Sequence, residues 1–224
     1  MQNSITVPLK KLAQVAHSVS RQRTLAMRVP EADIAELHEL GQDFNSLLDE
    51  LEAWQAHQRR ENASLLHQAT HDALTGLPNR ALFEARLDQA VTTGRLQEER
   101  FALLYLDCDR FKQINDTLGH AAGDDVLIAL ARRVQHQLRP MDLVCRLGGD
   151  EFAIFVKTEF NKKDLNNRLA NLCSKLKFMV DTLCVTCSVG ACTSPAYGND
   201  YQTMYQNADM ALLTAKRLGK NQYQ

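Results

Sequence analysis

The first third of the chain has apolar residues at helical spacing and contains few residues that break a helix. Between residues 1 and 70, Gly41 is the only glycine and Pro8 and Pro30 are the only prolines. This pattern predicts two helices joined by a connector. We expect the first helix over residues 7–21, with Pro8 in its first turn, where its missing N–H is harmless.

The connector and the second helix carry different apolar patterns. In the connector, residues 22–33, Leu25, Met27 and Val29 stand at alternate positions, as in an extended segment. The second helix, from about residue 34, has apolar residues at the 3-4 spacing of a parallel coiled coil. This heptad seam comprises Leu37, Leu40, Phe44, Leu47, Leu51 and Trp54. The seam predicts self-association, and the polar residues that follow it predict a weakened joint before the next region.

From residue 70 onward, short apolar runs typical of strands alternate with amphipathic runs typical of helices. We expect helices over residues 124–138, 163–179 and 201–216 and another from about residue 81, with strands over 101–106 and 183–191 and a hairpin over 144–156. The order β-α-β-β-α-β favours an α+β fold in which an antiparallel-containing sheet has helices on one face.

Charge and hydropathy exclude several classes of partner. Lys and Arg number 26 against 27 Asp and Glu, so the chain has no general attraction to nucleic acid or to an anionic membrane. No apolar run approaches the roughly 18 residues of a membrane span, and the N-terminus lacks the apolar core of a signal peptide. We therefore expect a soluble polypeptide that recognises its partner through a local site.

The six cysteines are predicted to be core residues of a protein in a reducing compartment. They are Cys108, Cys145, Cys173, Cys184, Cys187 and Cys192. Cys184 and Cys187 form a C-x-x-C pair, which in other settings binds zinc or performs redox chemistry. On one strand, residues three apart face opposite sides, so the core interpretation is favoured here.

Two acidic positions lie where strands are predicted to end. At the hairpin tip, Gly148 and Gly149 permit a tight turn and the close approach of a bulky ligand. Asp150 and Glu151 follow them and supply the hard oxygen ligands that suit Mg²⁺. Asp107 ends the buried run 101–106, where Asp is either a metal ligand or an ordinary turn residue.

The sequence of this hairpin tip and two further runs resemble the GGDEF family, the diguanylate cyclases. Residues 148–152 read G-G-D-E-F, and residues 72–80 match the D-x-L-T-G-L-x-N-R element that opens the domain. Residues 107–124 match the family's D-x-D-x-F-K-x-x-N-D-x-x-G-H-x-x-G-D run. The resemblance implies a palm-like, ferredoxin-like core shared with nucleotide cyclases and polymerases, and it places the domain boundary near residue 70.

The N-terminal region resembles a HAMP domain, a module that relays signals from a membrane receptor to a cytoplasmic output domain. The resemblance rests on the early Pro8, the extended connector, and Glu36 with Phe44 and Asn45 in the second helix. The alternative is an amphipathic hairpin that only dimerises. We expect a HAMP-like domain over 1–57, a coiled-coil linker helix over 58–70 and a GGDEF domain over 71–224.

Residues 43–50, with Trp54 and Gln55, are similar to a group of inner-membrane cyclases within the family. This similarity implies the cytoplasmic portion of a bacterial inner-membrane receptor, whose membrane segments lie outside this chain. We also expect a regulatory protein that acts on a sensor region outside this chain.

The family resemblance implies condensation of two GTP molecules into cyclic di-GMP with release of two pyrophosphates. The expected cofactor is Mg²⁺, with Mn²⁺ as an alternative. Its implied ligands are Asp107, Asp150 and the Cys108 carbonyl, while Glu151 is either a further ligand or the base that deprotonates the attacking hydroxyl.

The resemblance also assigns the substrate-binding residues. Asn115 and Asp124 are expected to recognise guanine, because a carboxylate accepts the guanine N1–H and N2–H₂ donors and faces adenine poorly. Lys112, Lys216 and Lys220 are expected to hold phosphates. The family usually has Arg at the position of Lys220, and Lys keeps the charge but loses the forked donor.

Arg139 and Asp142 form an R-x-x-D motif that matches the family's product-inhibition site. The alternative for this pair is ordinary solvated charge at a helix end. Because each domain binds one GTP, the resemblance implies a homodimer whose geometry the HAMP region controls. Two rival hypotheses stay open, a silent GGDEF domain that senses GTP or cyclic di-GMP, and a scaffold in which only the coiled coil matters.

Overall fold

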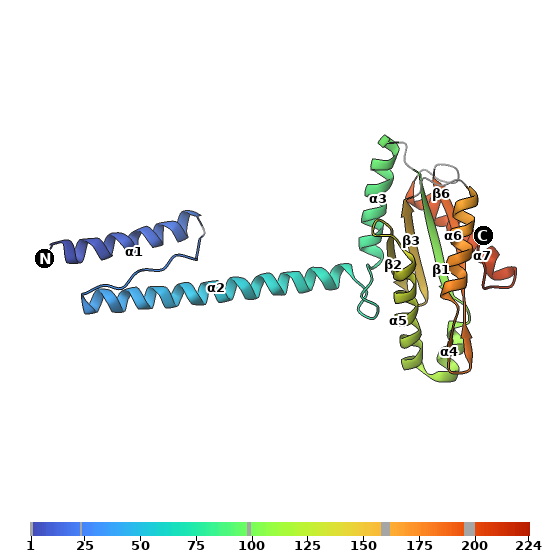
Figure 1. The fold of residues 1–224 in the computed structure, drawn as a ribbon, viewed down its shortest axis with the longest axis horizontal. Coiled ribbons are helices and arrows are strands. Elements are labelled where there is room, and N and C mark those ends of the chain that lie inside the picture. The colour runs from blue at the N-terminus through green and yellow to red at the C-terminus, as the bar shows by residue number, and fades with distance from the viewer. Residues whose placement is uncertain (1, 23, 98–99, 158–161, 195–199) are drawn as a thin grey trace. The chain divides into compact units, whose positions relative to one another are not determined.

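The computed structural model describes residues 2–22, 24–97, 100–157, 162–194 and 200–224. The chain divides into two compact units, Met1–His67 and Gln68–Gln224. Most elements of each unit are labelled in Figure 1. We describe each unit by itself.

The first unit is built from two helices and the connector between them (Figure 1). Helix α1 covers Gln2–Gln22 and helix α2 covers Ala35–Thr70. The predicted start of α2 is confirmed. The predicted start of α1 is wrong, because the helix begins before Val7 and Pro8 therefore lies inside it, beyond the first turn.

The connector packs against α2 through a small apolar cluster of Val15, Leu25, Val29 and Leu48. The side-chain amide of Asn45 accepts from the Val29 N–H at 2.8 Å and donates to the Val29 carbonyl at 2.9 Å. This pairing satisfies both backbone groups of an extended residue, as a neighbouring strand would. Met27 is 39% exposed, so the predicted alternation buries Leu25 and Val29 but not the residue between them.

Most of the heptad seam faces away from this cluster, although Phe44 packs against it and Leu37 is half-buried. Leu40, Leu47, Leu51 and Trp54 are all exposed, and Trp54 retains 61% of its accessible surface. The buried residues of α2 are Gly41 and Leu48 instead. One chain alone therefore leaves an apolar stripe along α2 uncovered, which is the arrangement that a partner helix requires. Among the described helices, none combines the length and the hydropathy that crossing a bilayer demands.

The second unit contains an antiparallel sheet with helices on both faces (Figure 1). The helices of the unit are α3 (Arg80–Gln97), α4 (Phe111–Leu118), α5 (His120–Gln137), α6 (Lys162–Leu176) and α7 (Tyr201–Arg217). The strands are β1 (Phe101–Cys108), β2 (Leu143–Gly148), β3 (Glu151–Lys157), β4 (Phe178–Val180), β5 (Leu183–Val185) and β6 (Cys187–Ser194). The four-stranded sheet has the order β2-β3-β1-β6, and β4 and β5 form a separate hairpin.

Both faces of the central strand β1 are covered, so the prediction of helices on one face is wrong. Leu104 and Leu106 pack into the core formed with α5 and α6. Leu103 and Tyr105 point to the opposite side and pack with residues of α3 and α7. Every residue of β1 is buried, which explains why its sequence is a continuous apolar run rather than an alternating one.

Three predicted boundaries also differ from the structure. The helix predicted to reach Met179 ends at Leu176, and β4 follows it. The strand predicted over 183–191 is divided at Thr186, whose carbonyl accepts from the Asp109 N–H at 2.8 Å. Helix α5 begins at His120 rather than after Asp124, and the short helix α4 was not predicted.

The cysteines follow the core prediction with one exception. Five are buried, Cys184 is exposed, and none of the six is in a disulfide. The sequence analysis placed Cys184 and Cys187 on one strand, but Cys184 lies on β5 and Cys187 on β6. Burial raises the pKa of the Cys145 thiol to about 12, which keeps it protonated and unreactive.

Helix α7 packs directly on β6 at Gly190. A Cβ atom at this position would lie 2.0 Å from the Ala208 carbonyl oxygen and 2.3 Å from the Leu212 nitrogen. Gly190→Ala is therefore expected to lower the free energy of unfolding by about 3 kcal/mol, near the upper end for overpacking. Urea unfolding of this variant and the wild type measures the effect, and equal unfolding free energies would contradict the close packing.

Candidate active site

The acids of the hairpin tip lie beside the end of the central strand. The register of β1 and β3 places Asp107 opposite Glu151, so their side chains share one face of the sheet. The backbone of Cys108 donates to the Asp150 carbonyl at 3.2 Å, which joins the strand end to the turn. The predicted proximity of the three acids is thus present in the fold.

The turn itself depends on the two glycines. Gly148 pairs with Glu151 across the hairpin, and Gly148 and Gly149 have φ angles of 146° and 53°. Residues other than glycine rarely adopt these φ angles. No heavy atom beyond the chain neighbours lies within 4 Å of a Cβ added at either position. The backbone at the tip is therefore open to the close approach of a ligand.

Asp107 is buried and is paired with a lysine from α7. Its Oδ2 lies 2.6 Å from the Nζ atom of Lys216. The pKa of Asp107 is raised to about 6, chiefly by burial and also by the charge of Asp150, while the hydrogen bond and charge of Lys216 oppose the rise. Burial also raises the pKa of Asp150. These carboxyls are therefore costly to ionise together, and a bound cation would relieve their repulsion.

The donor atoms fit a hard divalent cation in kind, since they are carboxylate and carbonyl oxygens. Within the described ranges, however, no three His, Cys, Asp or Glu side chains already form a metal-binding group. Asp107 is occupied by Lys216, and Glu151 accepts at 2.8 Å from the Tyr105 hydroxyl. A cation that binds Oδ2 of Asp107 would therefore displace the ammonium group of Lys216.

Tyr105 and Tyr205 were not predicted as site residues. Tyr105 lies two residues before Asp107 and therefore shares its face of β1. Its hydroxyl also lies 3.0 Å from that of Tyr205 on α7. The sequence contained one indication of this role. The hydroxyl-bearing Tyr105 lies two residues before Asp107, in a run that is otherwise apolar.

Asp109, the second acid of the D-x-D element, has a different environment from Asp107. It is buried and accepts from the Thr186 hydroxyl at 2.8 Å, the Ser188 hydroxyl at 2.7 Å and the Asn221 N–H at 2.9 Å. Its carboxylate thus anchors the C-terminal loop. In that loop Lys220 has φ of 66°, and its N–H donates to the Ala215 carbonyl.

An arginine that was not predicted as a site residue connects the opening element of the domain to the glycine turn. Arg146 donates to both Asp72 oxygens at 3.0 and 3.1 Å, and to the Gly149 carbonyl at 2.9 and 2.7 Å. Burial alone would raise the pKa of Asp72, but hydrogen bonds from Thr75 and Arg146 outweigh it and hold the pKa below its ordinary value. Arg146 therefore ties the turn to the start of the domain.

The predicted guanine-binding residues lie on α4 and α5. Asn115 packs against Gly123, where an added Cβ would lie 1.9 Å from the Asn115 Oδ1 atom. That oxygen is buried and has no hydrogen-bond partner among the described residues. Asp124 and Lys112 are exposed. This part of the site thus contains the buried Asn115 oxygen, which lacks a donor. The Asp124 carboxylate follows Gly123, the glycine that leaves room for this oxygen.

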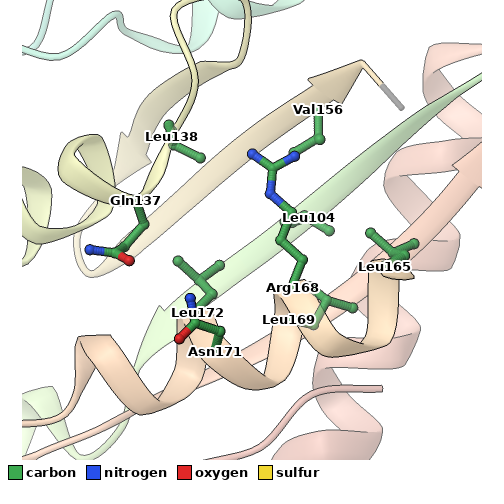
Figure 2. A pocket seen from close by; sticks show the side chains of 9 residues that line it. All are labelled: Leu104, Gln137, Leu138, Val156, Leu165, Arg168, Leu169, Asn171 and Leu172. Carbon is green, nitrogen blue, oxygen red and sulfur yellow. The ribbon is translucent and has the colours of Figure 1, made fainter. Parts of the chain in front are cut away.

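The R-x-x-D pair is only partly solvated. Arg139 is exposed, but the Asp142 side chain is fully buried, and its Oδ2 accepts from the Arg139 N–H at 2.9 Å and from Arg168 on α6. Arg168 also lines a cavity of about 30 Å³ between the end of α5, α6 and the sheet. Figure 2 shows its guanidinium group extending toward Leu138 and Val156. The simple alternative of two solvated charges is therefore wrong for Asp142.

Comparison with known proteins agrees with this fold and site. The family model "Diguanylate cyclase, GGDEF domain" matches residues 69–222, and the HAMP domain model matches residues 1–53. The chain belongs to the GGDEF family, and it carries a HAMP domain before the GGDEF domain.

Within the family, the chain is similar to diguanylate cyclase TpbB, also named YfiN, of Pseudomonas aeruginosa. The two are 48% identical over 218 residues, which is 95% of this chain and 50% of TpbB. The chain thus spans about half the length of this relative. The solved GGDEF domain of TpbB superposes with a TM-score of 0.64 and 39% identity, covering 68% of this chain and 91% of that one.

A second solved structure, DgcB of Caulobacter crescentus, comprises a coiled coil and a GGDEF domain in complex with cyclic di-GMP. It superposes with a TM-score of 0.70 and 26% identity, covering 80% of this chain and 97% of that one. The predicted similarity to one group of cyclases within the GGDEF family is confirmed. The predicted α+β fold class is also confirmed, apart from the helices expected on only one face of the sheet.

Proposed function

We propose that this chain is the signalling and catalytic portion of a diguanylate cyclase, which joins two GTP molecules into cyclic di-GMP and releases two pyrophosphates. The observation that carries this proposal is the register of Asp107 opposite Glu151 beside an open glycine turn. Phosphoryl transfer requires charge neutralisation and alignment more than covalent chemistry by the protein. Acids, lysines and an approachable backbone are the groups that this reaction needs.

A divalent cation, Mg²⁺ with Mn²⁺ as the alternative, would be held by Asp107, Asp150 and the Cys108 carbonyl. When bound, it neutralises phosphate charge and polarises the phosphorus that is attacked. Glu151 either completes this ligand set or accepts the proton of the attacking 3′-hydroxyl. The ammonium group of Lys216 would leave Asp107 and hold phosphate oxygens.

The other lysines extend the phosphate grip. Lys112 on α4 and Lys220 in the C-terminal loop would bind phosphate oxygens as point charges. The Asp109 carboxylate holds the backbone beside Lys220 through the Asn221 N–H. Gly148 and Gly149 would let the nucleotide lie against the turn, because no side chain projects from them.

Guanine recognition would use the buried Asn115 oxygen that lacks a donor. The exocyclic amine and N1–H of guanine are donors, so this oxygen and the Asp124 carboxylate would be satisfied on binding. Adenine presents an acceptor at N1 and would leave Asp124 without a donor there. The pair therefore favours GTP over ATP.

This assignment predicts that Asn115→Ala raises the KM for GTP by about 10–100-fold, since about 1–3 kcal/mol of guanine pairing is lost. The kcat should change less, because Asn115 does not touch the reacting phosphate. Steady-state kinetics with GTP measures both constants. Gln113→Ala, at an exposed position of the same helix, is the matched control. An unchanged KM in the Asn115 variant would contradict the assignment.

Each domain would bind one GTP, so the active enzyme is a homodimer in which two GGDEF domains face each other. The exposed heptad seam on α2 would bring the two chains together. We place the HAMP-like domain at 1–57, the linker helix at 58–70 and the GGDEF domain at 71–224. A change of packing in the HAMP domain would permit or prevent the facing arrangement.

The similarity to TpbB supports a place on the cytoplasmic side of a bacterial inner membrane, anchored by segments outside this chain. A regulatory protein would then act on the sensor region rather than on the residues described above. Product feedback through Arg139 and Asp142 would require cyclic di-GMP to compete with Arg168 for the Asp142 carboxylate.

The direct test of the proposed reaction is incubation of the purified chain with GTP and Mg²⁺, with cyclic di-GMP and pyrophosphate quantified by chromatography. Two pyrophosphates for each cyclic di-GMP, and no product from ATP, would support the proposal. Tight GTP binding without turnover by a dimeric sample would instead indicate a silent sensing domain.

A further inference from the structure

Glu151 stands at the end of a line of three hydrogen-bonding side chains, which come from three different elements. The Tyr105 hydroxyl on β1 lies 2.8 Å from Glu151 Oε2, and the Tyr205 hydroxyl on α7 lies 3.0 Å from that of Tyr105. The guanidinium of Arg80, at the start of α3, lies 3.4 Å from the Tyr205 hydroxyl and 5.9 Å from the centre of its ring.

The hydrogen-bonding capacity of each group fixes the direction of this line. An ionised carboxylate only accepts, so the single hydroxyl proton of Tyr105 is donated to Glu151. Tyr205 must then donate its own proton to Tyr105. Arginine only donates, so Arg80 contributes to the Tyr205 oxygen. Every donor therefore points toward Glu151, and hydrogen bonds aligned in this way polarise one another.

The tyrosines are held firmly enough to act as a support. Tyr105 is 2% exposed and packs among Phe83, Leu103 and Leu212. Its ring meets that of Tyr205 edge to face, with centroids 5.3 Å apart. The Tyr105 hydroxyl, which donates to Glu151, is thus fixed in position by burial and by its contact with Tyr205.

We propose that Tyr105, supported by Tyr205, is a positioning residue that holds one oxygen of Glu151 and thereby directs the other oxygen toward the reacting groups. This proposal rests on the proposed cyclase function. It also gives Arg80, the last residue of the D-x-L-T-G-L-x-N-R element, a role in supporting Glu151. A carboxylate with one oxygen held presents a single free oxygen, whether as a metal ligand or as a base.

Tyr105→Phe tests the proposal, because it removes the hydroxyl and keeps the buried ring. We expect kcat for cyclic di-GMP formation to fall by about 10–100-fold, the effect of a misplaced reacting group, with the KM for GTP changed by less than about twofold. Tyr205→Phe should lower kcat by a smaller factor. The double variant should equal Tyr105→Phe alone, because Tyr205 reaches Glu151 only through Tyr105.

Tyr223→Phe is the matched control, because Tyr223 packs into the core on the other face of the sheet and should leave kcat unchanged. A normal kcat in Tyr105→Phe, or equal and additive losses from the two tyrosines, would overturn the proposal. A rise in KM with unchanged kcat would also overturn it, since that pattern indicates altered GTP binding rather than a misplaced Glu151.

A measurement that needs no turnover separates this proposal from the function on which it rests. Urea unfolding midpoints of Tyr105→Phe, Glu151→Ala and their double variant form a thermodynamic cycle. The proposal predicts non-additive midpoint shifts even if the wild type makes no cyclic di-GMP. Additive shifts would show that the two side chains do not interact, and would reject the proposal while leaving the cyclase function intact.

Discussion

Replacement of Asp107 by asparagine is expected to lower the rate of cyclic di-GMP formation by about a thousandfold or more. Asn keeps the shape of the side chain but removes the charge that a divalent cation needs. Charge stabilisation by a bound cation contributes several kcal/mol to a phosphoryl-transfer transition state, and each 1.4 kcal/mol or so is tenfold in rate. Initial rates of product formation with GTP and Mg²⁺ measure the loss.

The stability of the Asp107→Asn variant should change little by comparison. The substitution breaks the ion pair with Lys216, but it also removes a buried carboxylate whose ionisation is unfavourable. Asp88→Asn, an exposed acid on α3, is the matched control and should retain full activity. A folded Asp107→Asn protein with wild-type activity would show that this acid does not hold the metal.

Glu151→Gln is expected to lower kcat by about 10²–10⁴-fold, the range for loss of a general base or of a charged metal ligand. The amide oxygen of Gln can still accept from the Tyr105 hydroxyl, so the packing around the site should be retained. The variant therefore separates the charge of Glu151 from its position. The measurement is kcat at saturating GTP, and the fold is checked by circular dichroism.

The same variant distinguishes the rival hypotheses. A scaffold that acts only through the α2 coiled coil would be indifferent to Glu151, and so would a domain that only binds nucleotide. Retention of GTP binding together with loss of turnover is the result expected for a cyclase. Full turnover in Glu151→Gln would exclude any role of this carboxylate as a base or essential ligand.

Local patterns in the sequence were sufficient to predict most of the elements that form the site, but not α4, which carries Lys112 and Asn115. The apolar run of β1, the glycine pair of the hairpin and the heptad seam are each patterns contained in one segment, so period and composition predict them. The acids at the strand ends followed from those elements. The family resemblance then supplied the roles of Asn115, Asp124 and the lysines, which no local pattern determines.

The features that were missed depend on contacts between distant segments. Tyr105 and Tyr205 are separated by 100 residues, and Arg146 and Asp72 by 74. The continuous apolar sequence of β1 indicates burial but does not count the helices that cover it, so the second layer of α3 and α7 was not expected. Thr186 was predicted to lie within a strand, because the apolar pattern gives no indication of its hydrogen bonds with Asp109.

The heptad seam shows the opposite case, in which the sequence predicts a contact that the single chain does not make. The spacing of Leu40, Leu47 and Trp54 predicted an interface, and the single chain leaves these side chains uncovered. A partner helix is the occupant that the heptad spacing favours. The sequence thus predicts a partner helix, which one chain by itself does not supply.

Cyclic di-GMP is expected to form only where two GGDEF domains, each with one GTP, face each other. The most direct test measures the rate of product formation per chain over a series of protein concentrations, with the dimer fraction determined in parallel by light scattering. We predict that the rate per chain rises with concentration in proportion to the dimer fraction and then reaches a plateau. A rate per chain that is independent of the dimer fraction would contradict the account, because a single domain would then suffice for the reaction.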